Sequence, residues 1–448
     1  MSATTVLIKG ADIVRNVSAN ANGAGSGPAD LLISGGTIVA TGPEAAERAP
    51  SGVSRLDAYG LVALPGMVDL HTHLREPGRE DSETIESGSR AAALGGFTAV
   101  FAMANTSPVT DTAEAAERVF DLGQRAGYVD VFPIGAVTKE LAGAELAELG
   151  LMARSRAGVR VFSDDGKCVH DARLMRRALE YVKSFDGVVS QHAQDPKLAD
   201  SGACAHEGEL SGRLGLQGWP GVAEESIVAR DVMLARHTGS RVHIAHVSTA
   251  GSVEVIRWAK AQGINVTAEV TPHHLVLTTD LLATYDPVYK VNPPLRPASD
   301  VQALREALAD GTIDIVATDH APHVRADKEH AFGDAAFGML GLEQALSVVS
   351  TAMVSTGAMT WADVARVMSV APAQIARLSS HGQALAAGAP ANLTLVDPTR
   401  EVIVDAAQSQ SLSRNNPWHG RSLTGTVHLS MLRGRVTARE GLVWAGEA

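Results

Sequence analysis

The feature that most constrains the fold is a pattern repeated eight times: a short apolar run, a polar residue at its C-terminal end, and then a helical segment. Near-continuous apolar runs are typical of strands buried on both faces of a parallel sheet. Eight strand–helix units in series predict an α/β protein with a (β/α)8 barrel, which usually takes about 250 residues. The predicted strands span residues 66–74, 97–105, 129–138, 158–165, 187–193, 241–248, 265–274 and 313–322.

Helical segments between these strands support the barrel. Five of them end at a glycine, which can adopt the left-handed conformation that terminates a helix; they span residues 111–127, 172–187, 224–239, 251–263 and 299–311. The first opens on Asp111 with Glu114 three residues later, which predicts a capping box. A doubly wound open sheet is the alternative, but the chain has no dinucleotide-binding glycine fingerprint, so a closed barrel is favoured.

The two ends of the chain predict a second, smaller domain. Residues 4–64 and the C-terminal stretch contain short apolar strands separated by glycine turns. We expect these ends to pair into a small β-sandwich domain of residues 1–63 and 384–448, beside a barrel domain of residues 64–383. The glycine-rich segment 19–29 predicts a surface loop.

Composition narrows the environment and the partners. With only two cysteines in 448 residues, a disulfide scaffold is excluded and a cytoplasmic location is expected. The net charge of −12 argues against nucleic acid and anionic membranes as partners. No apolar run reaches the roughly 18 residues of a membrane span, and the first residues do not resemble a secretory signal.

Six metal-ligating side chains fall at the C-terminal ends of five predicted strands. His71 and His73 alternate on one strand, so both point to the same side, and in a barrel that side faces the mouth where active sites lie. A lone histidine is more often a packing or surface residue, but the full set predicts a metal centre. Imidazoles with carboxylates suit Zn²⁺, with Mn, Co or Fe as alternatives, and six ligands favour two ions bridged by a carboxylate. The six are His71, His73, Asp165, His192, His246 and Asp319.

Four motifs resemble the dihydroorotase family of the amidohydrolase superfamily. They are "DLHTHLREPG" at 69–78, "HVS" at 246–248, "NPPLR" at 292–296 and "TDHAPH" at 318–323, and the resemblance extends over essentially the whole chain. It implies two zinc ions, one held by His71, His73 and Asp319 and the other by His192 and His246.

The resemblance also bears on the bridge between the ions. Many superfamily members use a carboxylated lysine, but strand four ends in "VFSDDG", similar to the bacterial branch that uses an aspartate. Asp165 is the expected bridge, because Asp164 should point the opposite way along the strand. Lys167 is the rival, and a surface lysine is its simpler interpretation.

A substrate site is expected next to the metals. Arg75 has the same parity as His71 and His73, and a guanidinium can bind a carboxylate through two parallel hydrogen bonds. Without the adjoining histidines, an arginine in a surface ion pair would be the default interpretation. The resemblance implies that a substrate carboxylate and pyrimidine ring contact seven residues: His73, Arg75, Asn105, Asn292, His323, Phe337 and Gly338.

The implied activity is the reversible cyclisation of N-carbamoyl-L-aspartate to dihydroorotate and water in pyrimidine synthesis, with Asp319 carrying the proton. A hydantoinase, dihydropyrimidinase or allantoinase is the first alternative, although those enzymes usually carry the lysine and lack the "HLREPG" arginine. A non-catalytic partner of aspartate transcarbamoylase is the second, and the complete ligand set argues against it. A homodimer is the expected assembly, and association with that transferase stays open.

Three further parts of the sequence are expected to lie near the site. Residues 323–338 form either a lid over the substrate or an ordinary surface loop. His273 and His274 follow strand seven near the rim, and we expect them to support the site rather than bind metal. Cys168 is expected to be a bystander.

Overall fold

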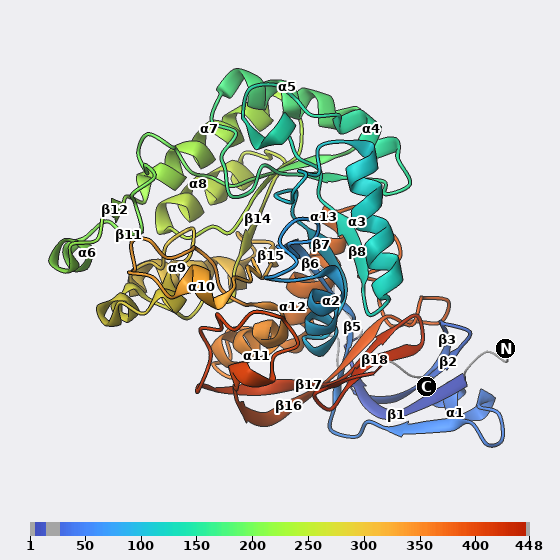
Figure 1. Cartoon of the computed structure of the whole chain (residues 1–448). Coiled ribbons are helices and arrows are strands. Elements are labelled where there is room, and N and C mark those ends of the chain that lie inside the picture. Colours follow the sequence, from blue (N-terminus) through green and yellow to red (C-terminus); the bar gives the residue numbers. More distant parts are fainter. Residues whose placement is uncertain (1–4, 15–26, 445–448) are drawn as a thin grey trace.

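The computed structural model describes residues 5–14 and 27–444 and confirms a (β/α)8 barrel with a β-domain at its side (Figure 1). Among the described residues, a helix with the length and apolar character of a membrane span is not found. The barrel strands are parallel and follow one another in chain order. They are β6 (Met67–Thr72), β7 (Phe97–Ala102), β8 (Asp130–Pro133), β9 (Val161–Phe162), β10 (Val188–Gln191), β13 (Val242–Ile244), β14 (Val266–Val270) and β15 (Ile315–Val316).

The barrel closes through two short contacts between its two sheet segments. The segment β6–β7–β8 meets β9 through a parallel bridge between Gly135 and Phe162, and β6 meets β15 through one between Thr72 and His320. At the second closure the His73 amide donates to the His320 carbonyl at 2.8 Å. The closing strands therefore bring the first histidine motif directly beside the segment that contains Asp319.

The strands are shorter than the apolar runs predicted. The run 158–165 contributes only Val161 and Phe162 to the sheet, and 313–322 only Ile315 and Val316. An apolar run reports burial, whereas a strand also requires the backbone to pair with its neighbours. At the mouth the chain turns away from the sheet, and both His246 (φ 28°) and Asp319 (φ 48°) have left-handed backbones there.

Helices surround the barrel strands in Figure 1. Left-handed glycines end three of the predicted helices, at Gly127, Gly239 and Gly311. The helices are α2 (Ile85–Leu94), α3 (Ala113–Ala126), α4 (Leu149–Arg154), α5 (Ala172–Lys183), α7 (Val222–Thr238), α8 (Ala250–Ala261), α9 (Ala298–Asp310), α10 (Arg325–Lys328), α11 (Ala345–Val349), α12 (Trp361–Ala365) and α13 (Ala371–Ile375).

Two helix-end predictions were wrong. The capping box of Asp111 and Glu114 does not form, because Thr112 caps α3 by accepting from the Ala115 amide at 3.2 Å. The Asp111 carboxylate instead accepts from the Glu140 amide at 2.9 Å, so a tertiary contact replaces the local cap. Helix α5 ends at Ser184, three residues before the predicted glycine.

The two ends of the chain meet in one nine-stranded sheet beside the barrel, where blue and red strands lie together in Figure 1. Strand β16 pairs antiparallel with β5, with Leu393 opposite Pro65. Of the predicted loop 19–29, residues 19–26 lie outside the described residues, and Pro28 begins β2. The sheet elements are β1 (Thr5–Ile13), β2 (Pro28–Ser34), β3 (Thr37–Thr41), α1 (Pro43–Arg48, a helix between strands), β4 (Ser54–Asp57), β5 (Val62–Pro65), β16 (Leu393–Ile403), β17 (Ser422–Leu432), β18 (Arg435–Arg439) and β19 (Leu442–Val443).

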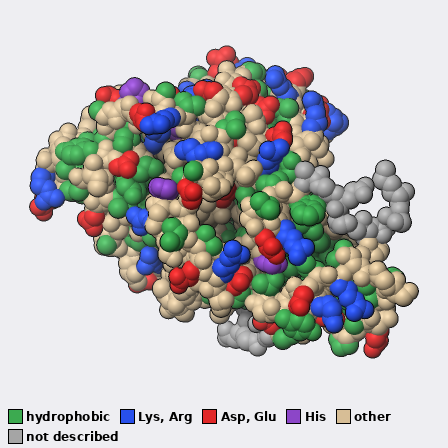
Figure 2. Space-filling model, turned by 60° about the horizontal axis from the view of Figure 1, so that its bottom comes forward, with side chains coloured by type: hydrophobic (Ala, Val, Ile, Leu, Met, Phe, Trp, Pro, Cys, Tyr) green, Lys and Arg blue, Asp and Glu red, His purple; other side chains and the backbone are tan. Residues whose placement is uncertain are grey.

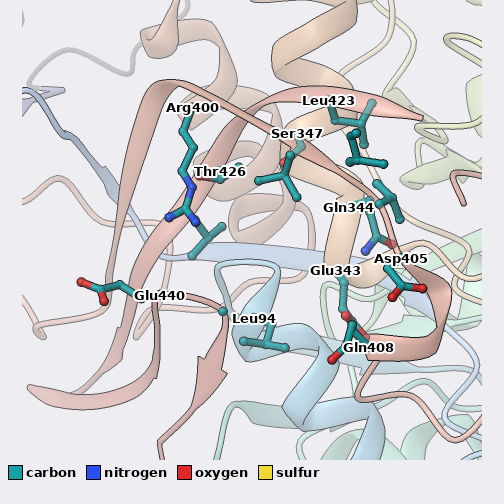
Figure 3. Close-up of a pocket in the computed structure, with 15 residues that line it drawn as sticks. Leu94, Glu343, Gln344, Ser347, Arg400, Asp405, Gln408, Leu423, Thr426 and Glu440 are labelled. Atoms are coloured by element: carbon teal, nitrogen blue, oxygen red, sulfur yellow. The ribbon is translucent and has the colours of Figure 1, made fainter. Parts of the chain in front are cut away.

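Outside these two parts, a small excursion leaves the barrel between β10 and β13. It contains β11 (Ala205–His206), α6 (Glu209–Leu214) and β12 (Gly218–Trp219). On the face shown in Figure 2, acidic and basic side chains are interspersed. A groove of about 300 Å³ lies between the barrel and β16–β17 (Figure 3), and the residues that line it include none of the predicted site residues.

Asp130 ties the barrel to the sheet. It lies at the start of β8, is buried, and accepts from Arg433 at 2.5 and 2.9 Å and from His381 at 2.9 Å. Burial alone would raise the pKa of this carboxyl, but the hydrogen bonds from His381 and Arg433 outweigh burial and leave a pKa of about 2. The unfolded value is 3.8, so this group stabilises the fold above about pH 4, and that contribution is lost as the pH falls towards 2.

We therefore expect Asp130→Asn to lower the free energy of unfolding at pH 7 by about 2 kcal/mol. The difference in free energy of unfolding between this variant and the unsubstituted protein should narrow as the pH falls from about 4 towards 2, which urea unfolding at several pH values would measure. Asp121→Asn is the matched control, because Asp121 pairs with Arg156 on the exposed surface, where ion pairs contribute little to stability. A pH-independent loss at Asp130 would contradict this account.

Candidate functional site

A buried carboxylate surrounded by four imidazoles forms the centre of the barrel mouth. Oδ1 of Asp165 lies 3.2 Å from Nε2 of His246 and 3.3 Å from both Nδ1 of His192 and Nε2 of His71. Its second oxygen lies 3.3 Å from Nε2 of His73. Four imidazoles from the ends of three strands therefore converge on one carboxyl group.

Asp319 completes the set from the opposite side. Its Oδ1 lies 3.1 Å from Nε2 of His73 and 3.4 Å from Nε2 of His71. Burial would raise the pKa of this carboxyl, but the His71 charge and the His73 hydrogen bond prevail and lower it to about 2. Burial would also raise the pKa of Asp165, but the nearby His71 charge outweighs it and holds this pKa well below its usual range. Both carboxylates are therefore ionised at neutral pH and available as ligands.

These residues fit a divalent cation. Nε2 of His71 is buried and makes no hydrogen bond within the described residues, although carboxylate oxygens lie 3.3 and 3.4 Å away. Such an orphaned nitrogen facing two carboxylates is what a metal ligand looks like. Two three-residue groups have ligand atoms within 4.8 Å of one another: His71 with Asp165 and His246, and His71 with His73 and Asp319. His192 lies beside the first group, with its Nδ1 2.8 Å from Nε2 of His246.

Residues that the sequence reasoning missed orient these ligands. Nδ1 of His71 lies 2.6 Å from Oε1 of the buried Glu269, so it carries the proton and leaves Nε2 free to face the centre. The other Glu269 oxygen lies 3.0 Å from His243, a second buried histidine. Likewise Nε2 of His192 donates to Gln194 at 2.8 Å, which turns Nδ1 towards Asp165. The sequence did contain a signal for this group, because Glu269 is a charged residue inside the apolar run 265–270.

The two neighbouring aspartates of strand four have opposite environments. Asp164 accepts from the Val137 amide at 2.8 Å, from the Thr138 amide at 2.9 Å, and from the Thr138 hydroxyl, so it holds the preceding loop. Asp165 alone faces the imidazoles. Lys167 is exposed, and Cys168 lines a cavity together with Gln194, the hydrogen-bond partner of His192.

The paired histidines after strand seven also differ. His274 bridges backbone segments, with Nδ1 2.8 Å from the Thr271 hydroxyl and Nε2 3.2 Å from the Pro293 carbonyl. It therefore supports the loop that carries Asn292. His273 is buried with Nε2 unpaired within the described residues, and burial lowers its pKa to about 4, so it stays neutral.

Arg75 reaches the mouth, but for a reason other than strand parity. Strand β6 ends at Thr72, and Arg75 lies in the following turn with a left-handed backbone (φ 62°). Its Nε donates to the Pro322 carbonyl at 3.0 Å, and its guanidinium lies 3.2 Å from Nε2 of His323. Burial lowers its pKa to about 10, so it remains a cation at neutral pH.

The other predicted substrate residues lie around the same centre. Asn105 accepts from Nδ1 of His73 at 3.0 Å. Asn292 donates to Gln194 at 3.3 Å, while its own Oδ1 is buried and unpaired within the described residues. The Phe337 carbonyl lies 2.7 Å from Nε2 of His323, and Gly338 (φ 138°) packs so closely that a Cβ there would lie 2.7 Å from the Ala321 Cβ.

The loop 323–338 lies against its neighbours in this structure. The buried Lys328 ammonium donates to the carbonyls of Lys290, Ala336 and Gly338 at 3.3, 2.8 and 3.1 Å. The residues that line a cavity of about 450 Å³ include Gly166 and Gln194, and those that line another of about 580 Å³ include His323 and Lys328.

Comparison with known proteins agrees with this geometry. A family model described as Dihydro-orotase-like matches residues 60–252. The dihydroorotase of Streptomyces coelicolor is 62% identical over 417 residues, which cover 93% of this chain and 96% of the relative. The dihydroorotase of Mycobacterium tuberculosis is 58% identical over 416 residues, again 93% and 96% of the two chains. This chain belongs to the dihydroorotase family.

Solved structures of related enzymes share the fold of this dihydroorotase family member. The L-hydantoinase (dihydropyrimidinase) of Arthrobacter aurescens superposes with a TM-score of 0.86 at 26% identity, covering 100% of this chain and 98% of that one. The dihydropyrimidinase of Brevibacillus agri gives 0.85 at 22% identity, covering 98% and 96%. These matches confirm the barrel with its β-domain, and the choice of substrate must come from the residues of the pocket.

The contrast between the adjacent aspartates gives a direct test of the metal site. We expect Asp165→Ala to lose most of its bound divalent metal, because the shared carboxylate is removed. Asp164→Ala should keep its metal but unfold at a lower temperature, because buried donors of Val137 and Thr138 lose their acceptor at about 1–3 kcal/mol. Elemental analysis after dialysis, with thermal unfolding, measures both. Equal metal content in the two variants would rule out Asp165 as a ligand.

Proposed function

We propose that this protein is a dihydroorotase, a cyclic amide hydrolase that interconverts dihydroorotate and N-carbamoyl-L-aspartate in pyrimidine synthesis. Family membership supports the reaction class. The observation that carries the substrate assignment is the partly buried Arg75 cation, whose guanidinium lies 3.2 Å from Nε2 of His323. A guanidinium there suits a substrate carboxylate, and Asn292 offers an unpaired acceptor to a ring N–H.

We propose two Zn²⁺ ions per chain, with Asp165 as the bridging ligand. His71, His73 and Asp319 would hold one ion, and His192 and His246 the other. When bound, such ions supply Lewis acidity that acidifies water and polarises the amide carbonyl. The short distances between Asp165 and all four imidazoles support the shared position.

Asp319 is the proposed proton carrier. In ring opening, water adds to the ring amide carbonyl, the carbon–nitrogen bond breaks, and a proton must pass from the water to the departing nitrogen. An ionised carboxylate 3.1 Å from His73 can accept that proton and return it to nitrogen. Ring closure runs the same steps backwards, with Asp319 starting protonated.

Arg75, Asn105 and His323 are proposed to bind the substrate carboxylate, with His73 adjoining them. Asn292 and the backbone at Phe337–Gly338 would contact the ring. A hydantoinase-type enzyme shares the fold but acts on rings without a carboxylate, which leaves the partly buried Arg75 without a counterion. That difference is why a dihydroorotate substrate is preferred here.

The cellular location and the oligomeric state of the protein are also proposed. Both cysteines are free, which supports a cytoplasmic location. We propose that the protein forms a homodimer, which is the commonest symmetric assembly. Size-exclusion chromatography with and without aspartate transcarbamoylase would test both the dimer and an association with that transferase.

The activity test compares two ring substrates. The purified protein should hydrolyse dihydroorotate and act far more slowly on hydantoin, since only the first has a carboxylate for Arg75. Chelation should abolish turnover, and added Zn²⁺ should restore it. Preference for hydantoin would favour the sister activity, and full activity after complete metal removal would contradict the proposed cofactor.

Removing the guanidinium tests the carboxylate site. Arg75→Ala should lower kcat/KM for dihydroorotate by the equivalent of about 2–5 kcal/mol, because a buried substrate carboxylate loses its partner. Arg75→Lys should recover part of that loss. Arg79→Ala is the matched control, since Arg79 is half exposed and pairs with Asp81 and Asp327 at the rim. A normal KM in Arg75→Ala would remove Arg75 from the pocket.

A further inference from the structure

A segment from the β-domain side of the chain crosses to the barrel mouth. Residues 409–416 lie in the connection between β16 and β17. Glu343 of the barrel accepts from the Gln410 amide at 2.9 Å, and the Ser413 hydroxyl donates to the Ser82 carbonyl at 2.8 Å. Figure 3 shows Glu343 and Gln344 beside Asp405 and Gln408, where this connection leaves β16. The barrel therefore anchors the segment on both sides.

Within this segment, the Asn415 side chain makes three hydrogen bonds, two as a donor and one as an acceptor. Its amide nitrogen donates to the Ala321 carbonyl at 2.9 Å and to the Gly338 carbonyl at 3.1 Å. Its amide oxygen accepts from the His323 amide at 3.2 Å. Asn415 is buried, so these bonds are shielded from water. One side chain thus joins two strips of backbone that are 15 residues or more apart in sequence.

Those two strips carry three of the proposed substrate contacts. One contains His323, and the other contains Phe337 and Gly338. They touch elsewhere as well, since the Ala321 amide donates to the Met339 carbonyl at 2.8 Å. Lys328 also holds the Gly338 carbonyl, at 3.1 Å. In contrast, within the described residues the His323 amide and the Ala321 carbonyl hydrogen-bond only to Asn415.

We propose that Asn415 is a positioning residue that sets the separation of His323 from Gly338 and so fixes the clamp on the substrate carboxylate and ring. It acts through those backbones and touches neither the metal ligands nor, by its own atoms, the reacting carbonyl. The proposal rests on the proposed function, because dihydroorotate defines what the clamp binds. The β-domain side of the chain thereby supplies a part of the specificity of the barrel.

The adjacent asparagine provides a matched control. Asn416 is also buried in the same segment, but its side chain donates to Gln344 at 3.1 Å and accepts from the Trp418 amide at 2.9 Å. Its contacts do not reach the two strips. Asn415→Ala and Asn416→Ala therefore remove the same group at neighbouring positions, and only the first should disturb the clamp.

We expect Asn415→Ala to raise the KM for dihydroorotate about ten-fold or more, with a smaller change in kcat and unchanged metal content. The Kd for orotate, measured by calorimetry, should rise by a similar factor. Asn415→Asp should be at least as impaired, because its second oxygen would face two carbonyl oxygens. Asn416→Ala should keep KM and Kd within about two-fold, whatever it does to the unfolding temperature.

Two outcomes would overturn the proposal. One is that Asn415→Ala and Asn416→Ala have the same KM for dihydroorotate and the same Kd for orotate, whether both are normal or both are raised. The other is that Asn415→Ala loses activity only because it has lost its metal. If Asn415→Ala does not fold, Asn415→Ser, whose hydroxyl can still accept from the His323 amide, takes its place with the same criteria. If the unsubstituted protein neither hydrolyses dihydroorotate nor binds orotate, the proposed function fails first and the clamp falls with it.

Discussion

The structure of the mouth depends on one buried carboxylate, Asp165, and the four imidazoles that surround it. An ionised carboxylate in a protein interior without partners would cost several kcal/mol. Here the imidazoles outweigh burial and keep the pKa of Asp165 low. Three of these imidazoles are in turn oriented by a neighbour: Glu269 orients His71, Gln194 orients His192 and Asn105 orients His73. The site is therefore a connected buried network, in which the loss of one member leaves others unpaired.

The barrel provides this network by departing from regular strand geometry at its C-terminal edge. Arg75, His246 and Asp319 all have left-handed backbones, which for residues other than glycine cost about 1–3 kcal/mol each. Surrounding contacts hold them there, including the Pro322 carbonyl for Arg75 and the Glu269 carboxylate for the His246 amide. Residues in such conformations cluster where function requires a particular side-chain direction. All three belong to the proposed metal and substrate sites.

The β-domain contributes more than a covering for the barrel. Arg433 binds Asp130 at the N-terminal end of β8, and residues 409–416 donate backbone hydrogen bonds to Glu83 and Glu343. The chain ends are thus coupled to both faces of the barrel. Segments outside the barrel therefore contact the rim of its mouth, as Asn415 does at the His323 amide.

The sequence alone determined the eight-unit barrel, the pairing of the chain ends in a sheet and the six polar side chains that converge at the barrel mouth. It could do so because burial periodicity and the position of polar residues at strand ends are local properties. The sequence also predicted that Asp165 and not Asp164 faces the imidazoles, although both lie beyond the end of β9 (Val161–Phe162), so strand alternation alone does not account for it. The resemblance to the dihydroorotase family supplied the expected substrate residues, among them Arg75 in "HLREPG".

Only the tertiary structure decided which groups stabilise those ligands. Glu269 acts on His71 across 198 positions of the chain, and Asn415 acts on Gly338 and Ala321 across 77 and 94 positions, and no periodicity encodes such pairs. The same limit explains the short strands and the Thr112 cap, where a distant backbone competed for the local partner. Local sequence fixes which surfaces are apolar and which atoms can ligate, whereas the direction of each polar side chain depends on partners that folding alone brings near.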